Sequence, residues 1–222
     1  MLGYIALAHE HVAGQHDDDL NRYLSRAQAS GERARDLIEK MLTFSRGQAG
    51  SPQHIDAVEL LREAGTATRA KLPEELEIGC QLSQSWPPVL QDPAHFEQVL
   101  LDLCLNAADA MTGKGCVIIR ANPHPSTATV CTSCRQSIDG EYVEVAICDS
   151  GCGMAPEVIE RIFEPFYSTH EVGRSSGMGL AIVHGITHEH GGHIVVESEP
   201  GQGSCMRVLL PLANSGKREP GE

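Results

Sequence analysis

The chain alternates between two kinds of hydrophobic spacing from residue 52 onward, and this alternation limits its fold more than any other feature. Helical spacing is expected over residues 56–71, 93–110 and 179–190, whereas alternating apolar residues predict strands over 78–82, 117–120, 142–148, 194–198 and 205–210. The turn at residues 200–203 joins the last two strands as a hairpin. Mixed helices and mostly antiparallel strands predict an α+β fold, a two-layer sandwich with the helices on one face of the sheet.

Residues 1–50 carry a different pattern, which predicts an α-helical hairpin. Apolar or small residues recur at alternating four- and three-residue steps from Leu20 to Met41, the heptad spacing of a helix that packs on another helix. The amphipathic helical pattern is already under way at Met1, so we expect that the chain was cut from a longer one. The predicted organisation is a partial hairpin over 1–50, a folded domain over 51–213 and a flexible tail over 214–222.

Composition excludes several classes of function. The formal net charge is −13 and no basic cluster interrupts it, so we expect no nucleic-acid partner. No apolar run approaches the roughly 20 residues that cross a bilayer, and the N-terminus lacks the basic flank that is typical of a signal peptide. We therefore expect a cytoplasmic location without membrane contact by this fragment, whether or not the parent protein is anchored. The eight cysteines lack a disulfide-scaffold rhythm, so reduced thiols are expected.

The helix expected over 93–110 carries a polar stripe on an otherwise apolar surface. Gln98, Asp102, Asn106 and Asp109 follow one another at four- and three-residue steps and so share one face. A buried amide or carboxyl group without a partner costs about 1–3 kcal/mol, so the stripe is either solvated or bound by a ligand. An amide oxygen such as that of Asn106 suits a hard cation such as Mg²⁺.

Two glycine-rich segments are further candidates for binding. Asp149 ends a predicted strand, and Gly151 and Gly153 after it permit the backbone to approach a flat ligand closely. The Asp149 carboxylate could accept a hydrogen bond from an exocyclic amine of that ligand. Gly177 and Gly179 precede a helix, whose free N–H groups suit a phosphate. Each segment alone is equally consistent with an ordinary turn.

The order of these segments resembles a known family. "DLCLNAADAM", "ICDSGCGM", "FEPFYST", "GRSSGMGLAIVHGI" and "EPGQGS" follow one another as do the N, G1, F, G2 and terminal boxes of the histidine-kinase ATP-binding domain. The resemblance covers about residues 52–212, and the preceding segment ending in "KMLTFSR" is similar to the dimerisation hairpin of the same sensor kinases. It implies the histidine-kinase/gyrase-type ATPase fold, with ATP and Mg²⁺ as cofactors.

The resemblance assigns roles to residues that match the boxes. It implies that Asn106 holds Mg²⁺ and that Asp149 binds the adenine amine. The other residues implied in nucleotide binding are Asp109, Gly151, Gly153, Met154, Phe166, Gly177, Met178, Gly179, Leu180 and Ser204. Phe163 and Phe166 would anchor a mobile lid.

The implied activity is that of a sensor histidine kinase. The γ-phosphoryl group of MgATP would pass to a histidine and then to an aspartate on a response-regulator receiver domain, and the hairpin would form a homodimer. The phosphoacceptor histidine would lie about two turns before Met1, so we expect no autophosphorylation by this chain alone. His9 precedes Glu10 as in a histidine–acid pair, but lies on the wrong side of the family landmark "LGYIALA".

Several positions depart from the family pattern. Asp102 stands where sensor kinases usually have Asn and where gyrase-type ATPases have a water-activating Glu, so it is the candidate catalytic residue for ATP hydrolysis. A gyrase or mismatch-repair type ATPase is therefore the alternative function. His170 and Arg174 replace lid lysines, and Ser175 replaces a glycine.

Two Cys/His clusters suggest a third function, a non-catalytic metal-binding interaction module. Cys131 and Cys134 have zinc-knuckle or redox spacing, but no second C-x-x-C exists. We interpret them as incidental thiols of a β-hairpin, with a metal between chains or a disulfide as alternatives. The histidine-rich segment 184–193 lacks the H-E-x-x-H pattern, so we expect no metal there.

Overall fold

The computed structural model describes residues 5, 18–46, 51–82, 87–112, 114–124, 129–169 and 176–213. The chain forms two compact units, Met1–Gln48 and Ala49–Glu222. The first predicted helix before residue 14, His9, the lid residues 170–175 and the tail over 214–222 lie outside the described residues, apart from residue 5. No helix in the described part of the chain is long and apolar enough to span a membrane.

The first unit contributes one long helix, α2 (Asp18–Arg46). Its heptad positions include Leu20 and Ile38, and both side chains are exposed, Ile38 by 57%. An exposed apolar stripe at heptad spacing is typical of a helix whose partner is another helix.

The second unit is built on a five-stranded sheet in the order β2-β4-β7-β9-β8. The strands are β2 (Leu76–Leu82), β4 (Gly115–His124), β7 (Tyr142–Asp149), β8 (His193–Ser198) and β9 (Ser204–Pro211). Only β2 and β4 pair in parallel within this sheet, and the other neighbours are antiparallel. Two small sheets join β1 (Gln53–Ile55) to β3 (Val89–Gln91) and β5 (Thr129–Val130) to β6 (Ser137–Ile138).

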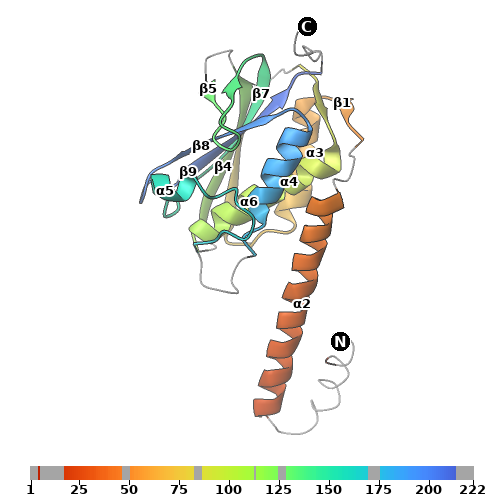
Figure 1. Ribbon diagram of the computed structural model, residues 1–222, viewed down its shortest axis with the longest axis vertical. Coiled ribbons are helices and arrows are strands. Elements are labelled where there is room, and N and C mark those ends of the chain that lie inside the picture. The colour runs from red at the N-terminus through yellow and green to blue at the C-terminus, as the bar shows by residue number, and fades with distance from the viewer. Residues whose placement is uncertain are drawn as a thin grey trace. The chain divides into compact units, whose positions relative to one another are not determined.

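Three helices form the second layer on one face of this sheet, as Figure 1 shows. They are α3 (Ala57–Arg69), α4 (Pro93–Ala110) and α6 (Gly179–Glu189), and α4 lies between the other two. A short helix, α5 (Pro156–Ile159), follows β7. The predicted α+β two-layer sandwich is confirmed.

The helix starts follow from local side-chain chemistry. Asp56 and Asp92 cap α3 and α4, and the carboxylate of each accepts two backbone N–H groups of the first turn. Pro93 occupies the first turn of α4, where its missing N–H group costs nothing. Helix α6 differs, because no side chain in the described part of the chain caps it. Among those residues, no side-chain oxygen accepts from its first N–H groups.

The core lies between the helices and the sheet. Fully buried side chains of α4 meet those of β4 and β7 there, among them Phe96, Leu100, Leu103, Val117, Ile119, Val145 and Ile147. Burying each such side chain stabilises the fold by about 1.5–3 kcal/mol. This packing fixes the position of α4 and hence of its polar stripe.

The structure corrects one expectation about the cysteines. Cys148 on β7 and Cys205 on β9 are directly opposite each other and are joined by a disulfide. The expectation of reduced thiols was wrong for this pair, because strand pairing places residues 57 positions apart side by side. The other six cysteines are free thiols.

Candidate functional site

The polar stripe of α4 enters the interior. Asp102 is only 3% exposed, and its carboxylate accepts a hydrogen bond of 2.8 Å from the Gln98 side chain. Asn106 is half-buried, and its amide nitrogen is buried without a partner among the residues that the structure describes. Asp109 is exposed near the C-terminal end of the helix. The interpretation of a solvated face is therefore wrong for Asp102.

The end of β7 delivers Asp149 beside the C-terminal end of α4. The Asp149 carboxylate accepts a 2.7 Å hydrogen bond from the Gly151 amide. Burial raises the pKa of Asp149, and hydrogen bonds from the Gly151 and Ser204 amides only partly oppose this. A methyl group on Gly151 would lie 2.7 Å from the Ala110 methyl group, and the Cys152 amide donates to the Ala110 carbonyl. Only glycine fits at position 151, because the loop after β7 is pressed against α4.

The turn between β8 and β9 closes over this loop. Gly153 has a φ of +64°, and a methyl group there would collide with the Glu199 carbonyl. The half-buried Met154 donates its amide to the Ser198 hydroxyl, which lies 2.9 Å from the hydroxyl of the buried Ser204. Ser204 is also the residue directly opposite Asp149 across the sheet. Ser204 therefore belongs to the same end of the sheet as Asp149.

The segment containing Phe166 is joined to the loop before α6. Phe166 has a φ of +67° and is 56% exposed, and its amide donates to the Gly177 carbonyl at 2.9 Å. A methyl group on Gly177, itself at a φ of +64°, would lie 2.6 Å from the Phe166 carbonyl carbon. Phe163 contacts the His184 ring on α6, with 5.9 Å between the ring centroids.

The first turn of α6 meets the polar stripe of α4. A methyl group on Gly179 would lie 3.7 Å from the Asn106 amide nitrogen and 3.8 Å from the Asp102 carboxyl carbon. Met178 is buried before this turn, and Leu180 is half-buried within it. The uncapped N-terminus of α6 and the unpartnered amide of Asn106 are therefore neighbours. A helix N-terminus attracts anions, and an amide oxygen binds hard cations.

The arrangement suits a ligand that is flat and polar at one end and anionic at the other. A half-buried carboxylate lies at the end of β7, and α4 connects it to the helix N-terminus beside Asn106. Residues 91–214 match the family described as histidine kinase-, DNA gyrase B- and HSP90-like ATPases. The chain belongs to this family.

Relatives of this ATPase domain are sensor kinases. Sensor kinase CckA of Brucella abortus (strain 2308) is 33% identical over 189 residues, which make up 85% of this chain and 20% of that protein. Sporulation kinase E of Bacillus subtilis (strain 168) is 25% identical over 216 residues, 97% of this chain and 27% of that protein. The chain thus spans between a fifth and a third of these relatives' lengths.

A solved structure supports the same assignment. Full-length ShkA in complex with AMPPNP superimposes with a TM-score of 0.70 and 26% sequence identity, over 95% of this chain and 42% of that chain. The resemblance to the ATP-binding domain of sensor histidine kinases is confirmed by the family match and these relatives. They do not favour the gyrase-type alternative.

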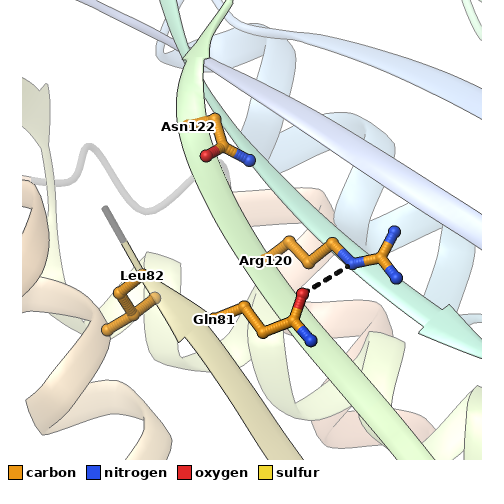
Figure 2. A pocket seen from close by; sticks show the side chains of 4 residues that line it. All are labelled: Gln81, Leu82, Arg120 and Asn122. Carbon is orange, nitrogen blue, oxygen red and sulfur yellow. Dashed lines mark hydrogen bonds between the residues drawn. The ribbon is translucent and has the colours of Figure 1, made fainter.

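A hollow elsewhere on the ATPase domain has no part in this arrangement. Figure 2 shows the side chains that line it, Gln81 and Leu82 of β2 and Arg120 and Asn122 of β4. Its volume is about 280 Å³, and the Arg120 side chain donates to that of Gln81 at 3.2 Å. It contains none of the residues that the sequence selected.

Three residues of the ATPase domain contact the predicted set without having been predicted. Ala110 and Glu199 contribute backbone carbonyls against the glycines, and the Ser198 hydroxyl bonds to Met154, Gly203 and Ser204. Backbone carbonyls leave no mark in a sequence. Ser198 ends a predicted strand, and nothing in its local pattern distinguishes it from a surface serine.

Proposed function

We propose that residues 51–213 bind MgATP between α4, the end of β7 and α6, as the catalytic part of a sensor histidine kinase. The observation that carries this proposal is the buried amide nitrogen of Asn106, which has no partner among the described residues and lies beside the first residue of α6. Leaving such a donor unsatisfied costs about 1–3 kcal/mol, which a phosphate oxygen that accepts from it would recover.

The adenine base is proposed to lie against Asp149. A carboxylate accepts hydrogen bonds only, so it suits the exocyclic amine of adenine. The amides of Gly151 and Ser204 hold the carboxylate in place, and the tight loop at Gly151 and Gly153 leaves no side chain in front of the base. Met154 and Ser204 would complete this end of the site.

The phosphates are proposed to lie at the start of α6. Gly177, Gly179 and Leu180 would turn backbone N–H groups toward them, with the helix dipole favouring negative charge, whereas the Met178 amide donates to the Ser176 hydroxyl at 3.3 Å and would have to exchange that bond for one to a phosphate. Asn106 would hold Mg²⁺ through its amide oxygen, and the exposed Asp109 lies one turn further along α4. Bound Mg²⁺ neutralises charge on the phosphates, which phosphoryl transfer requires more than covalent help from the protein.

The γ-phosphoryl group is proposed to pass to a histidine and then to an aspartate of a response-regulator receiver domain. The names of the relatives, a sensor kinase and a sporulation kinase, support kinase activity, and the order of transfer is what the resemblance to sensor histidine kinases implies. The phosphoacceptor is proposed to lie outside this sequence, so the chain alone would not autophosphorylate. Because ATP is the phosphoryl donor, the proposed location of this domain is the cytoplasm.

A homodimer is proposed through the helical hairpin of residues 1–50. The exposed heptad side chains of α2, such as Leu20 and Ile38, support this. Pairing two such helices would stabilise the dimer by about 25 cal/mol for each Å² of apolar surface that is buried.

Asp102 is proposed as a general base for slow ATP hydrolysis at the same site. Its carboxyl carbon would lie 3.8 Å from a methyl group on Gly179, close to the proposed phosphate position. A general base typically contributes a factor of about 10²–10⁴ to the rate. Steady phosphate release that is unchanged in Asp102→Asn would exclude this role.

Calorimetric titration with AMPPNP, with and without Mg²⁺, tests the nucleotide site. In Asp149→Asn we expect affinity to fall by about 10- to 100-fold, because a charge-assisted hydrogen bond is worth about 1.5–3 kcal/mol. In Asn106→Ala we expect the Mg²⁺-dependent part of the affinity to disappear. The exposed Asp139→Asn and Asn122→Ala are matched controls that should bind normally. Unchanged affinity in both site variants would reject the proposed position.

A further inference from the structure

The turn that joins β5 to β6 holds two thiols that the proposed nucleotide site does not use. Cys131 is 0% exposed, and its amide and carbonyl bond to the Gln136 carbonyl and the Arg135 amide. Arg135 has a φ of +62°, which is uncommon outside glycine and makes this turn tight. The sulfurs of Cys131 and Cys134 and the Nε2 atom of His188 consequently lie within 4.8 Å of one another.

Backbone contacts dock this turn on the free edge of the main sheet. The Thr132 amide donates to the Ile194 carbonyl of β8 at 2.8 Å, and the Val196 amide donates to the Thr132 hydroxyl at 2.9 Å. The Ile194 amide lies 3.4 Å from the Cys131 sulfur as a donor. Strand β8 begins at His193, so docking on its edge brings the two thiols to that residue.

Two distances between sulfur and nitrogen atoms are close to the edge of a tetrahedral metal site, although His193 lies outside the group of three residues whose ligand atoms are all within 4.8 Å of one another. Cys131 Sγ lies 3.8 Å from His188 Nε2, and Cys134 Sγ lies 3.9 Å from His193 Nδ1. Ligands bound tetrahedrally at about 2.3 Å for sulfur and 2.0–2.1 Å for nitrogen stand roughly 3.5–3.8 Å apart. The spacings are also those of a zinc site, C-x₂-C followed by H-x₄-H.

We propose that Cys131, Cys134, His188 and His193 bind one Zn²⁺ ion. Two thiolates and two imidazoles in tetrahedral geometry select zinc over harder cations. The thiols would release their protons to solvent on binding, and the metal would replace the 2.8 Å contact between the Ser133 hydroxyl and His188 Nε2.

The zinc would be a structural ion that stabilises the β5–β6 hairpin. Strands β5 and β6 pair over only two residues each, and their small cluster of buried side chains is completed by Val195 and Leu209 of the main sheet. A short two-stranded hairpin is marginal by itself, whereas a structural zinc contributes folding free energy directly. The ion would tie this hairpin to the end of α6 and the start of β8. The interpretation of incidental thiols is replaced by this proposal.

Metal analysis of the purified 222-residue chain tests the site directly. We expect one zinc ion per chain after dialysis against metal-free buffer without strong chelator. After exchange with Co²⁺, we expect the visible bands of tetrahedral cobalt and an ultraviolet thiolate-to-cobalt charge-transfer band. Absence of both bound zinc and the charge-transfer band in reduced, folded protein would overturn the proposal.

Ligand variants with matched controls locate the metal. Cys134→Ser and His188→Gln should lose stoichiometric zinc and the Co²⁺ spectrum, whereas Cys80→Ser on β2 and His54→Gln on β1 should retain both. Circular dichroism checks that each variant is folded, and cobalt titration of the unaltered chain stays decisive if a variant does not fold. Mass spectrometry would show whether freshly purified protein contains a Cys131–Cys134 disulfide. Such a disulfide, together with a failure to take up metal after the disulfide is reduced, would contradict the proposal.

Discussion

At the residue scale, two side chains of the proposed site weaken the ligand-free domain. Asp149 is a half-buried carboxylate whose pKa burial raises, and Asn106 has a buried amide nitrogen without a partner in the described structure. Both groups lose hydration without full compensation, which destabilises the folded state. Their retention is explained if a bound nucleotide satisfies them, with its exocyclic amine donating to Asp149 and a phosphate oxygen accepting from the Asn106 amide nitrogen.

This cost predicts that Asp149→Asn stabilises the ligand-free domain at pH 7. The folded-state pKa lies above the unfolded value of about 3.9, so ionisation costs more in the folded chain. Stability is therefore lost as pH rises from the unfolded pKa through the folded pKa, and the asparagine variant escapes that loss. We expect a higher Tm than that of the unaltered chain at pH 7, with the difference shrinking toward pH 4.

Thermal melts across this pH range, with Asp139→Asn as the control, measure the effect. The control should melt like the unaltered chain at every pH, because Asp139 is exposed. A Tm of Asp149→Asn below that of the unaltered chain at pH 7 would mean that the carboxylate stabilises the empty fold, contrary to this account.

At the element scale, the turn between β8 and β9 positions Asp149. Gly201 and Gly203 both have positive φ, at +78° and +82°. A methyl group on Gly203 would collide with the Asp149 carbonyl, whereas one on Gly201 would meet nothing within 4 Å. A substitution at either glycine would strain the backbone, but only a substitution at Gly203 would also disturb close packing.

We predict that Gly203→Ala destabilises the domain more than Gly201→Ala. The control variant bears only the cost of a left-handed backbone, about 1–2 kcal/mol. Gly203→Ala bears that cost and must also move β9 away from β7. Urea unfolding gives the denaturation midpoint of each variant, which reports stability if the m-values are equal. Equal midpoints for the two variants would show that the contact with Asp149 is unimportant to the fold.

Most of the elements were predictable because their causes are local. Capping aspartates at 56 and 92 and the alternating apolar residues of β7 and β9 act within a few positions. The proposed nucleotide-site residues come from a resemblance of ordered motifs, and the family match supports that resemblance. The spacing of the glycines alone was equally consistent with an ordinary turn and with a binding loop.

Features that depend on pairing between distant segments were missed. The disulfide joins Cys148 and Cys205 across a strand register that the sequence did not specify. The proposed zinc ligands are divided in the same way, since Cys131 reaches His188 only after the β5–β6 turn docks on β8. The histidine segment lacks the H-E-x-x-H pattern, and the proposed zinc site depends instead on the H-x₄-H spacing of His188 and His193.

At the scale of the whole molecule, the heptad stripe of α2 sets the expected assembly. Ile38 lies on this stripe and is exposed, whereas Arg26 lies off it on the same helix. A charge on the stripe would have to be buried between paired helices, but a charge at position 26 would stay in solvent. The two positions therefore test the stripe with the same substituent.

We predict that Ile38→Glu shifts the chain from dimer to monomer, while Arg26→Glu leaves the dimer intact. Light scattering coupled to size-exclusion chromatography gives the mass of each variant over a range of concentrations. A monomeric unaltered chain, or equal masses for both variants, would contradict assembly through this stripe.

The most direct test of the central claim is a crystal structure of this chain with Mg²⁺ and AMPPNP. The account predicts the adenine amine against the Asp149 carboxylate, the phosphates at the first turn of α6, and Mg²⁺ on the Asn106 amide oxygen. A nucleotide bound elsewhere, such as in the hollow beside Gln81 and Arg120, would contradict it. So would Asn106 and Asp149 contacting no common ligand.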